Sequence, residues 1–232
     1  MNKTASTRFD AIQARELLCA GLAEMSLTIK EGQINLLIDY LSLMAKWNPV
    51  YNLTAIRQTS EMVSTHLLDS LTIIDMFDQW LTNKAEAKIL DVGTGGGLPG
   101  VVLAIMRPQW SLTLIDPVHK KTAFLQQVKT QLQLDNLTVI NGKVEDLPSE
   151  ARFDLITSRA FSSLVNFVQL SEHVLQTGGC FAAMKGVFPI EEMDALREVF
   201  ADQWQIEPHE IHVPQLNAER HLVKITPIPH NP

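Results

Sequence analysis

The sequence is short of cysteine, of long hydrophobic runs and of basic residues. Its two cysteines, Cys19 and Cys180, lie 161 positions apart and have no histidine at metal-ligand spacing, which argues against a zinc site. A disulfide is disfavoured as well, because intracellular thiols stay reduced. We therefore expect two small buried side chains and no bound metal.

Hydrophobic runs are too short to span a membrane, and residues 1–10 are polar, without the apolar segment of a secretory signal. We expect a cytoplasmic protein that makes no use of a membrane. The 232 residues, 46% of them apolar, suffice for one α/β domain with a modest helical extension. The sequence contains no internal repeat, and we expect a monomer.

Basic residues are outnumbered, with 19 Lys and Arg against 26 Asp and Glu, so the formal net charge is −7. Dedicated nucleic-acid binders usually carry a basic surplus, and this balance argues mildly against an RNA or DNA substrate. It does not exclude one, because phosphate binding depends on a local basic patch rather than on the total charge.

The first 82 residues are predicted to be helical. Apolar residues between 34 and 45 recur at intervals of three and four, which is typical of one helical face. A capping box at Thr28–Glu31 is expected to begin this helix, and Pro49 to end it. A further helix is expected from about Thr59 to Phe77.

From Lys88 short apolar runs alternate with helical stretches, which indicates βα units and a parallel sheet. Strands are expected at 88–92, 112–115, 137–140, 153–157 and 180–184, with helices near 99–106, 120–132 and 164–174. Residues 210–213 and 221–225 flank a turn and are expected to form an antiparallel hairpin at the sheet edge. The sequence thus predicts a doubly wound α/β fold, with a helical cap over 1–82 packed on a core over 83–232.

The most informative segment runs from Ile89 to Gly100, where a strand enters a turn with five glycines in eight residues. Glycines permit positive φ and let a ligand approach the backbone. Pro99 suits the first turn of the following helix. The ligand of such a sheet lies beyond the carboxyl ends of its strands.

Two glycine patterns overlap in this turn. Gly93-x-Gly95-x-Gly97 is the form seen in enzymes that use S-adenosylmethionine, whereas Gly95-x-Gly97-x-x-Gly100 formally matches the dinucleotide fingerprint. A dinucleotide turn has its first glycine directly after the strand. That residue is Gly93, from which the third glycine arrives one residue too early. S-adenosylmethionine is therefore favoured over a dinucleotide, and a plain turn would need fewer glycines.

Three later strand ends can complete an adenosine site. Asp116 can accept from both ribose hydroxyls or cap the next helix. Glu145 can accept from the adenine amine, with Val144 offering its backbone, or stay a solvated carboxylate. Arg159 can clamp a carboxylate or a substrate phosphate, or be a surface arginine. No Asn/Asp-Pro-Pro-aromatic segment follows the fourth strand, which argues against methylation of adenine or cytosine amino groups.

At this point the sequence is similar to the RsmG (GidB) family, whose members methylate N7 of one guanine in bacterial small-subunit ribosomal RNA. The resemblance covers most of the chain, and the glycine loop alone is only class-specific. The Tyr51–Thr54 and Ser158–Phe161 pieces are more specific. The matching segments are 47–57, 66–71, the glycine loop with Leu98-Pro99-Gly100, 158–161, 184–186 and 219–223.

The resemblance implies a class I, Rossmann-like methyltransferase with a seven-stranded, mostly parallel sheet and a helical cap. It also implies donor contacts at Gly93, Leu98, Val144, Glu145 and Arg159, to which the strand-end pattern adds Gly95 and Asp116. Gly96 stands where we expect Pro or Ala in many relatives.

The implied acceptor, guanine N7, has a free lone pair at neutral pH, so no general base is needed and no catalytic residue is nominated. Placement of N7 in line with the sulfonium methyl, and desolvation, should carry the catalysis. N7 faces the deep major groove of an RNA helix, so the guanine must lie in a loop or be splayed out. The expected partner is 16S ribosomal RNA or the small ribosomal subunit.

Candidate substrate contacts are side chains that can stack on the base or meet phosphates. Phe161 is at least as readily a core residue, and Lys120 and Lys121 more readily form a solvated helix face. His66 and Asp69, one helical turn apart, can bind RNA or tie the cap to the core. The candidates are Arg57, His66, Phe161, Lys185, Arg220 and His221.

Three other functions stay open. The acidic pI favours a methyltransferase of small molecules, whereas an RNA enzyme should show a basic face around the crevice. A nicotinamide-dependent oxidoreductase would bind NADH rather than S-adenosylhomocysteine. A non-catalytic module would bind the donor and transfer nothing.

Overall fold

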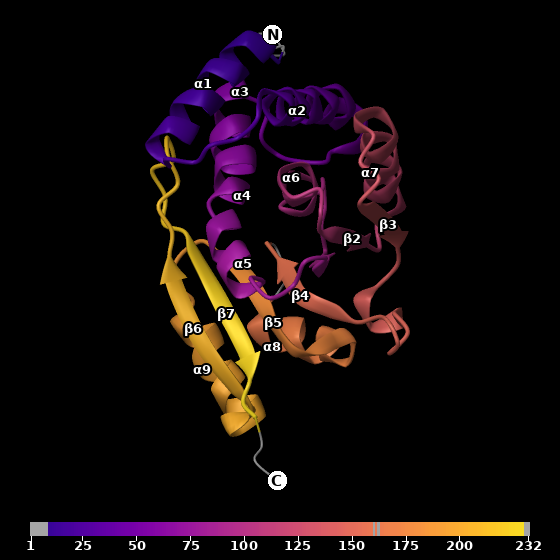
Figure 1. The fold of residues 1–232 in the computed structure, drawn as a ribbon, viewed down its shortest axis with the longest axis vertical. Helices are drawn as coiled ribbons and strands as arrows, with labels where there is room; N and C mark the ends of the chain where they lie inside the picture. Colours follow the sequence, from indigo (N-terminus) through magenta and orange to yellow (C-terminus); the bar gives the residue numbers. More distant parts are fainter. Residues whose placement is uncertain (1–8, 160, 162, 230–232) are drawn as a thin grey trace, which may run out of the picture.

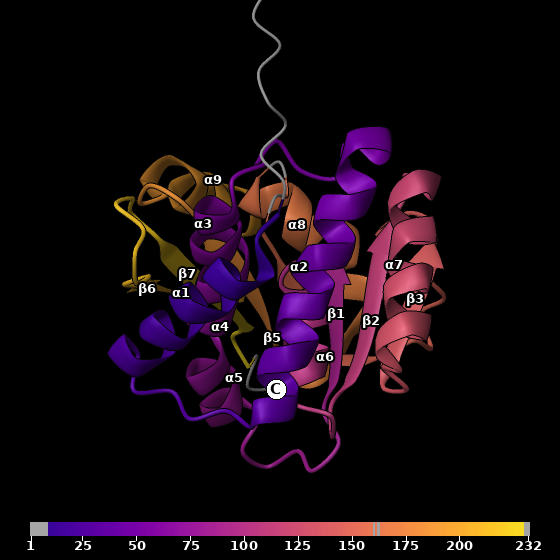
Figure 2. The ribbon, with the colours of Figure 1, turned by 90° about the horizontal axis from the view of Figure 1, so that it is seen from above.

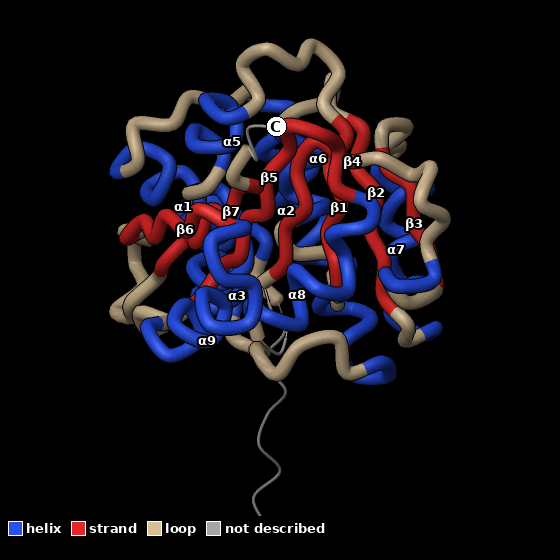
Figure 3. Tube along the Cα trace, turned by 90° about the horizontal axis from the view of Figure 1, so that it is seen from below, coloured by secondary structure: helices blue, strands red, loops and turns tan. Residues whose placement is uncertain are grey.

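The computed structural model describes residues 9–159, 161 and 163–229; Ala160 of the 158–161 segment and residues 1–8 of the polar amino-terminal stretch lie outside these. Within the described residues, seven strands form one sheet in the order β3-β2-β1-β4-β5-β7-β6 (Figure 3). The strands are β1 (Lys88–Val92), β2 (Ser111–Asp116), β3 (Leu137–Asn141), β4 (Phe153–Ser158), β5 (Leu175–Lys185), β6 (Trp204–Glu210) and β7 (His221–Pro227).

Strands β1 to β5 run parallel, and β7 is antiparallel to both β5 and β6. In register, Leu90 of β1 pairs with Thr113 of β2 on one side and with Ile156 of β4 on the other. The predicted doubly wound, mostly parallel fold is confirmed. Because β2 and β4 follow β1 on opposite sides, the strand order reverses at β1 and β4, where such sheets bind their ligands.

Helices on both faces cover the parallel strands (Figure 1). Before β1 come α1 (Ala11–Glu24), α2 (Glu31–Tyr51), α3 (Thr59–Met62), a π-helical segment (Val63–Leu68), α4 (Asp69–Leu71) and α5 (Ile74–Trp80). After β1 come α6 (Gly100–Met106), α7 (His119–Leu132), α8 (Leu164–Ser171) and α9 (Ile190–Phe200). Short 3-10 turns occupy Val144–Asp146, Glu172–Val174 and Ala201–Gln203.

Successive strand residues point to opposite faces, so the apolar strands feed two hydrophobic cores. Ile89 and Leu155 join the core under α1, α2, α6 and α7. Their neighbours Leu90 and Ile156 join the core of α8 and α9. In Figure 1 the first group of helices lies above the parallel strands and α8 and α9 lie below; Figure 2 shows α1 and α2 from above.

The first helices differ from the prediction at their ends. Helix α2 begins after the N-cap Lys30, whose N–H donates to Gln33 Oε1 at 3.0 Å, so the capping box predicted at Thr28–Glu31 is wrong. The helix also continues through Pro49 to Tyr51. Asn48 is buried, and its side chain accepts from Thr54 N at 3.0 Å. Asn48 therefore keeps helical geometry before the proline while its side chain bonds to the loop that follows the helix.

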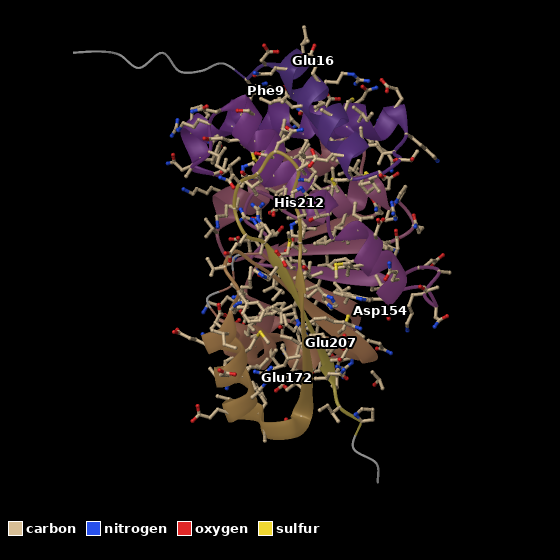
Figure 4. The ribbon with its side chains drawn as sticks, turned by 90° about the vertical axis from the view of Figure 1, so that its left-hand side faces the viewer. Phe9, Glu16, Asp154, Glu172, Glu207 and His212 are labelled. Atoms are coloured by element: carbon tan, nitrogen blue, oxygen red, sulfur yellow. The ribbon has the colours of Figure 1, made fainter. Side chains whose placement is uncertain are left out.

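The hairpin, too, differs from the prediction. Its first arm is β6 (Trp204–Glu210) rather than 210–213, because the connection packs on α1 instead of turning at once. In that connection Gln215 Nε2 donates to Leu17 O at 2.9 Å, and His212 Nε2 lies 3.2 Å from Glu24 Oε1. Figure 4 shows His212 near the amino-terminal helices. Helix α9, which no expected element covered, precedes β6.

The predicted second helix and one of the two cysteines also differ from expectation. The helix expected at 59–77 contains a π-helical segment and is interrupted after Leu71. Both cysteines are free thiols, and Cys19 is exposed, which corrects the expectation that both are buried. Among the described residues, no helix has the length and apolarity to cross a membrane, and no group of His, Cys, Asp or Glu has a metal-binding arrangement.

Candidate functional site

The glycine turn after β1 combines tight packing on one side with open space on the other. Gly93, Gly95 and Gly97 have φ of 65°, 61° and 100°, a region that favours glycine. A Cβ on Gly97 would lie 2.6 Å from both Leu125 Cδ2 and Val101 Cγ2. A Cβ on Gly93 or Gly95 would meet no described atom closer than 4.0 Å. The turn thus leaves Gly93 and Gly95 approachable by a ligand.

Asp91 of β1, which sequence analysis overlooked, fixes the glycine turn by accepting hydrogen bonds from two of its residues. It is fully buried, and its Oδ2 accepts from Thr94 Oγ1 at 2.7 Å and from Gly100 N at 2.9 Å. Burial raises its pKa to about 6 although these hydrogen bonds lower it. Its Oδ1 is buried without a hydrogen-bond partner among the described atoms. A carboxylate inside an apolar strand was the available signal, because buried charges need partners.

A second contact that sequence analysis missed comes from the helical cap. Tyr40 of α2 is fully buried and its hydroxyl donates to Gly96 O at 2.7 Å. Burial raises the pKa of this hydroxyl far above its usual value, so it stays a donor. A Cβ on Gly96 would lie 3.2 Å from Met44 Cε. The cap therefore shapes the turn directly.

Asp116 links the turn to the end of β2. It is buried, and its Oδ2 accepts from Gly95 N at 3.0 Å and from Lys121 Nζ at 3.2 Å. Its Oδ1 accepts from Val118 N at 2.9 Å, and Val118, not Asp116, is the N-cap of α7. Lys121 is therefore not part of a free solvated face, whereas Lys120 is exposed.

The other expected donor residues lie at neighbouring strand ends. Gly142 N, after β3, donates to Asp116 O at 3.3 Å, which ties the third loop to the second. Val144 is buried in the 144–146 turn, and Glu145 is exposed there, 4.0 Å from Lys143 Nζ. Leu98 is buried and precedes Pro99, which is the N-cap of α6 rather than its first residue. The loops after β1, β2 and β3 thus converge.

Arg159 leaves the tip of β4 and meets the cap. Its Nη1 donates to Thr65 O at 2.9 Å and to Asp69 Oδ2 at 3.4 Å. Asp69 Oδ1 accepts from Arg220 Nε at 3.0 Å. Burial raises the pKa of Asp69, and the two arginines oppose that rise only in part. One buried carboxylate therefore joins the cap, the tip of β4 and the start of β7.

These residues line a cavity of about 250 Å³. Its wall contains Thr65, Asp69, Arg159, Met184, Lys185, Gly186 and Arg220. The Lys185 ammonium is held by Glu192 Oε2 at 2.7 Å. The cavity thus mixes cationic, anionic and apolar groups.

The remaining candidate substrate contacts differ in burial and in their neighbours. Arg57 is exposed between α2 and α3. His66 is buried, with Nε2 3.1 Å from Thr54 Oγ1, and burial is the main cause that lowers its pKa to about 3. His221 is buried with Nδ1 2.8 Å from Gly186 O. Phe161 is half-buried, and its ring centroid lies 5.6 Å from that of Phe167, with the two rings tilted by 44°.

Comparison with known proteins points to one family. The family model described as rRNA small subunit methyltransferase G (GidB) matches residues 33–223. The Ribosomal RNA small subunit methyltransferase G of Laribacter hongkongensis is 50% identical over 211 residues, covering 91% of this chain and 97% of that protein. The protein of the same name from Janthinobacterium sp. (strain Marseille) is 49% identical over 222 residues, covering 94% and 96%.

Among solved structures, a SAM dependent methyltransferase from Aquifex aeolicus is similar in fold, with a TM-score of 0.56. It is 16% identical in sequence and the similarity covers 72% of this chain and 93% of that one. At this identity the likeness concerns the fold alone.

Proposed function

This chain belongs to the rRNA small subunit methyltransferase G family, and we propose that it transfers a methyl group from S-adenosylmethionine to N7 of one guanine in 16S ribosomal RNA. The observation that carries the proposal is the family match over residues 33–223, which includes the cap from residue 33 onwards, the glycine turn and the Arg159 segment. Neither a methyltransferase of small molecules nor a nicotinamide enzyme is favoured by that match.

The residues around the turn fit an adenosylmethionine ligand. Gly93 and Gly95 leave their outer side open, and Asp116 stands beside Gly95. An ionised carboxylate can accept about four hydrogen bonds, so Asp116 retains acceptor capacity for ribose hydroxyls beside its three bonds. Leu98, Val144 and Glu145 are proposed to hold the adenosine part, and Arg159 the donor carboxylate.

Bound S-adenosylmethionine supplies a methyl group on a positively charged sulfur. The chain then has to place a neutral guanine N7 beside that group and exclude water, because no proton must be removed. The methylated base is cationic, so a strong positive potential around it would oppose the reaction. The cations of the cavity are held by carboxylates, Arg159 by Asp69 and Lys185 by Glu192, which moderates that potential.

We further propose that the enzyme acts as a cytoplasmic monomer on 16S ribosomal RNA or the small subunit. Arg57, Lys185, Arg220 and His221 are proposed phosphate or base contacts, and Phe161 a stacking surface.

Nucleoside mass spectrometry tests the activity. Purified protein with S-adenosylmethionine is incubated with small-subunit RNA from a strain that lacks the gene, and large-subunit RNA serves as the control. We expect 7-methylguanosine in the small-subunit RNA alone. A methyl group on another atom, or none, would contradict the proposal.

A further inference from the structure

The cavity beside Arg159 adjoins the proposed donor site. It sits at the carboxyl ends of β4 and β5, and among the described donor residues only Arg159 lines it. Its volume of about 250 Å³ is below the range of about 300–1,000 Å³ that holds drug-sized ligands. The cavity therefore suits one flat base better than a longer stretch of RNA.

Asp69 gives this cavity an unusual chemical character. Its side chain is 3% exposed and accepts two hydrogen bonds, one from Arg159 and one from Arg220. Because an ionised carboxylate can accept about four hydrogen bonds, acceptor capacity remains in the cavity wall. The guanidinium N–H groups beside it are donors only. Acceptors and donors thus stand next to each other.

This arrangement separates the candidate ligands by their chemistry. The three cations of the wall are already paired, Arg159 and Arg220 with Asp69 and Lys185 with Glu192. A phosphate presents only acceptors, so it would leave the remaining acceptor capacity of the Asp69 carboxylate unmatched. The Watson–Crick edge of guanine carries two neighbouring N–H donors, on N1 and N2, next to the O6 acceptor. Adenine has a ring acceptor at N1, which a carboxylate does not satisfy. Guanine is the base whose edge matches the wall.

We propose that this cavity binds the Watson–Crick edge of the target guanine, with Asp69 accepting from N1–H and N2–H and Arg220 donating to O6. The inference rests on the proposed function, since it names the residue that selects guanine for that reaction. Holding this edge leaves N7, on the other side of the base, free to face the donor. Met184 and Thr65 supply the less polar part of the wall.

A single base change tests the inference in the unmodified enzyme. Inosine keeps O6, N1–H and N7 but lacks the N2 amine, so it remains a possible acceptor. Small-subunit RNA is prepared by ligation with guanosine or inosine at the methylated position, and kcat/KM is measured for both. Losing one hydrogen bond to a charged group should lower kcat/KM by about 10-fold to 100-fold.

Two variants then test whether Asp69 is the residue that discriminates guanosine from inosine. Asp69→Asn lacks the second acceptor oxygen, so the guanosine-to-inosine ratio of kcat/KM should fall to within about threefold. Asp78→Asn is the matched control, because Asp78 also pairs with an arginine, Arg107, and neither residue lines this cavity. It should leave the ratio unchanged. Binding of S-adenosylhomocysteine to each protein reports whether the donor site is intact.

The outcomes are distinct. No transfer to guanosine RNA by the unmodified enzyme would refute the proposed function itself. Transfer with a ratio near one would overturn the inference alone. The same holds if Asp69→Asn slows both RNAs equally, since the carboxylate would then be a structural tie. If Asp69→Asn fails to bind S-adenosylhomocysteine, the guanosine-to-inosine ratio of kcat/KM in the unmodified enzyme decides: a ratio of about 10 or more supports the inference, and a ratio near one overturns it.

Discussion

Among single residues, Arg159 is the proposed contact for the carboxylate of the methyl donor, and this role can be tested by substitution. Its guanidinium is already oriented by Thr65 O and Asp69, so it needs little reorganisation to meet a carboxylate. Arg159→Ala should weaken binding of S-adenosylhomocysteine about 10-fold to 100-fold, the effect of losing a hydrogen bond between charged groups. Titration calorimetry measures this, with Arg107→Ala as a control in a distant ion pair. Unchanged affinity in Arg159→Ala would remove the residue from the donor site.

His66 predicts a pH dependence of stability. Its pKa is about 3 in the folded protein, mainly through burial and secondly through the charge of Arg159, against 6.5 normally. Below pH 6.5 the unfolded chain binds a proton that the folded chain does not, so stability falls as the pH drops towards 3. From pH 7 to pH 5 this costs about 2 kcal/mol. His66→Gln should remove that loss.

Urea unfolding at pH 7 and pH 5 measures the change in the free energy of unfolding for each protein. Asp91 acts in the opposite direction, because its raised pKa of about 6 adds stability as the pH falls through 6 towards 4. It is present in both proteins, so it cancels when His66→Gln is compared with the unmodified chain. Equal pH dependence in the two would mean that His66 is not buried as a neutral ring.

The glycine turn is the element on which the donor site depends, and its glycines are not equivalent. Gly97→Ala combines a φ of 100° with contacts of 2.6 Å to Leu125 and Val101, and should cost about 2–5 kcal/mol of unfolding free energy. Gly178, exposed in β5, has a φ of 77° but no described atom within 4 Å of an added Cβ. Gly178→Ala should cost only the backbone strain, about 1–2 kcal/mol.

Chemical denaturation measures both costs, and S-adenosylhomocysteine affinity measures the effect on the site. Only Gly97→Ala is expected to weaken ligand binding, since its side chain would push the turn away from α7. Equal stability losses would show that packing beneath the turn adds nothing to the strain.

For the whole molecule, the cap and the sheet share one hydrophobic core. Leu37 of α2 and Leu67 of the π-helical segment belong to the same core as Ile89 of β1. Two polar contacts also connect the cap to the site: Tyr40 donates to Gly96 O in the glycine turn, and Asp69 pairs with Arg159. The boundary predicted near residue 82 falls in the connection between α5 and β1, and as a domain boundary it stays a prediction.

Local patterns in the sequence predicted most of the fold. The strand at 88–92 has the expected bounds, and the next parallel strands are longer than expected at one or both ends. Periodicity and glycine spacing suffice for this, because both depend on residues close together in the chain. Helix α9 was overlooked although Ile190, Met193 and Leu196 recur at helical spacing. The true first arm of the hairpin was missed because packing on α1 sets the length of the connection.

The sequence by itself determined the class of fold, the glycine turn and, through its resemblance, the family. Only the tertiary structure decided how Asp91 and Tyr40 shape the turn and how Asp69 joins Arg159 to Arg220. Residues 69, 159 and 220 are far apart in the chain and share no local pattern. They meet because Arg159 follows β4, the antiparallel pairing of β7 with β5 brings Arg220 to the same end of the sheet, and packing of the amino-terminal helices places Asp69 there. Burial at this place raises the pKa of Asp69, an effect that sequence spacing cannot predict.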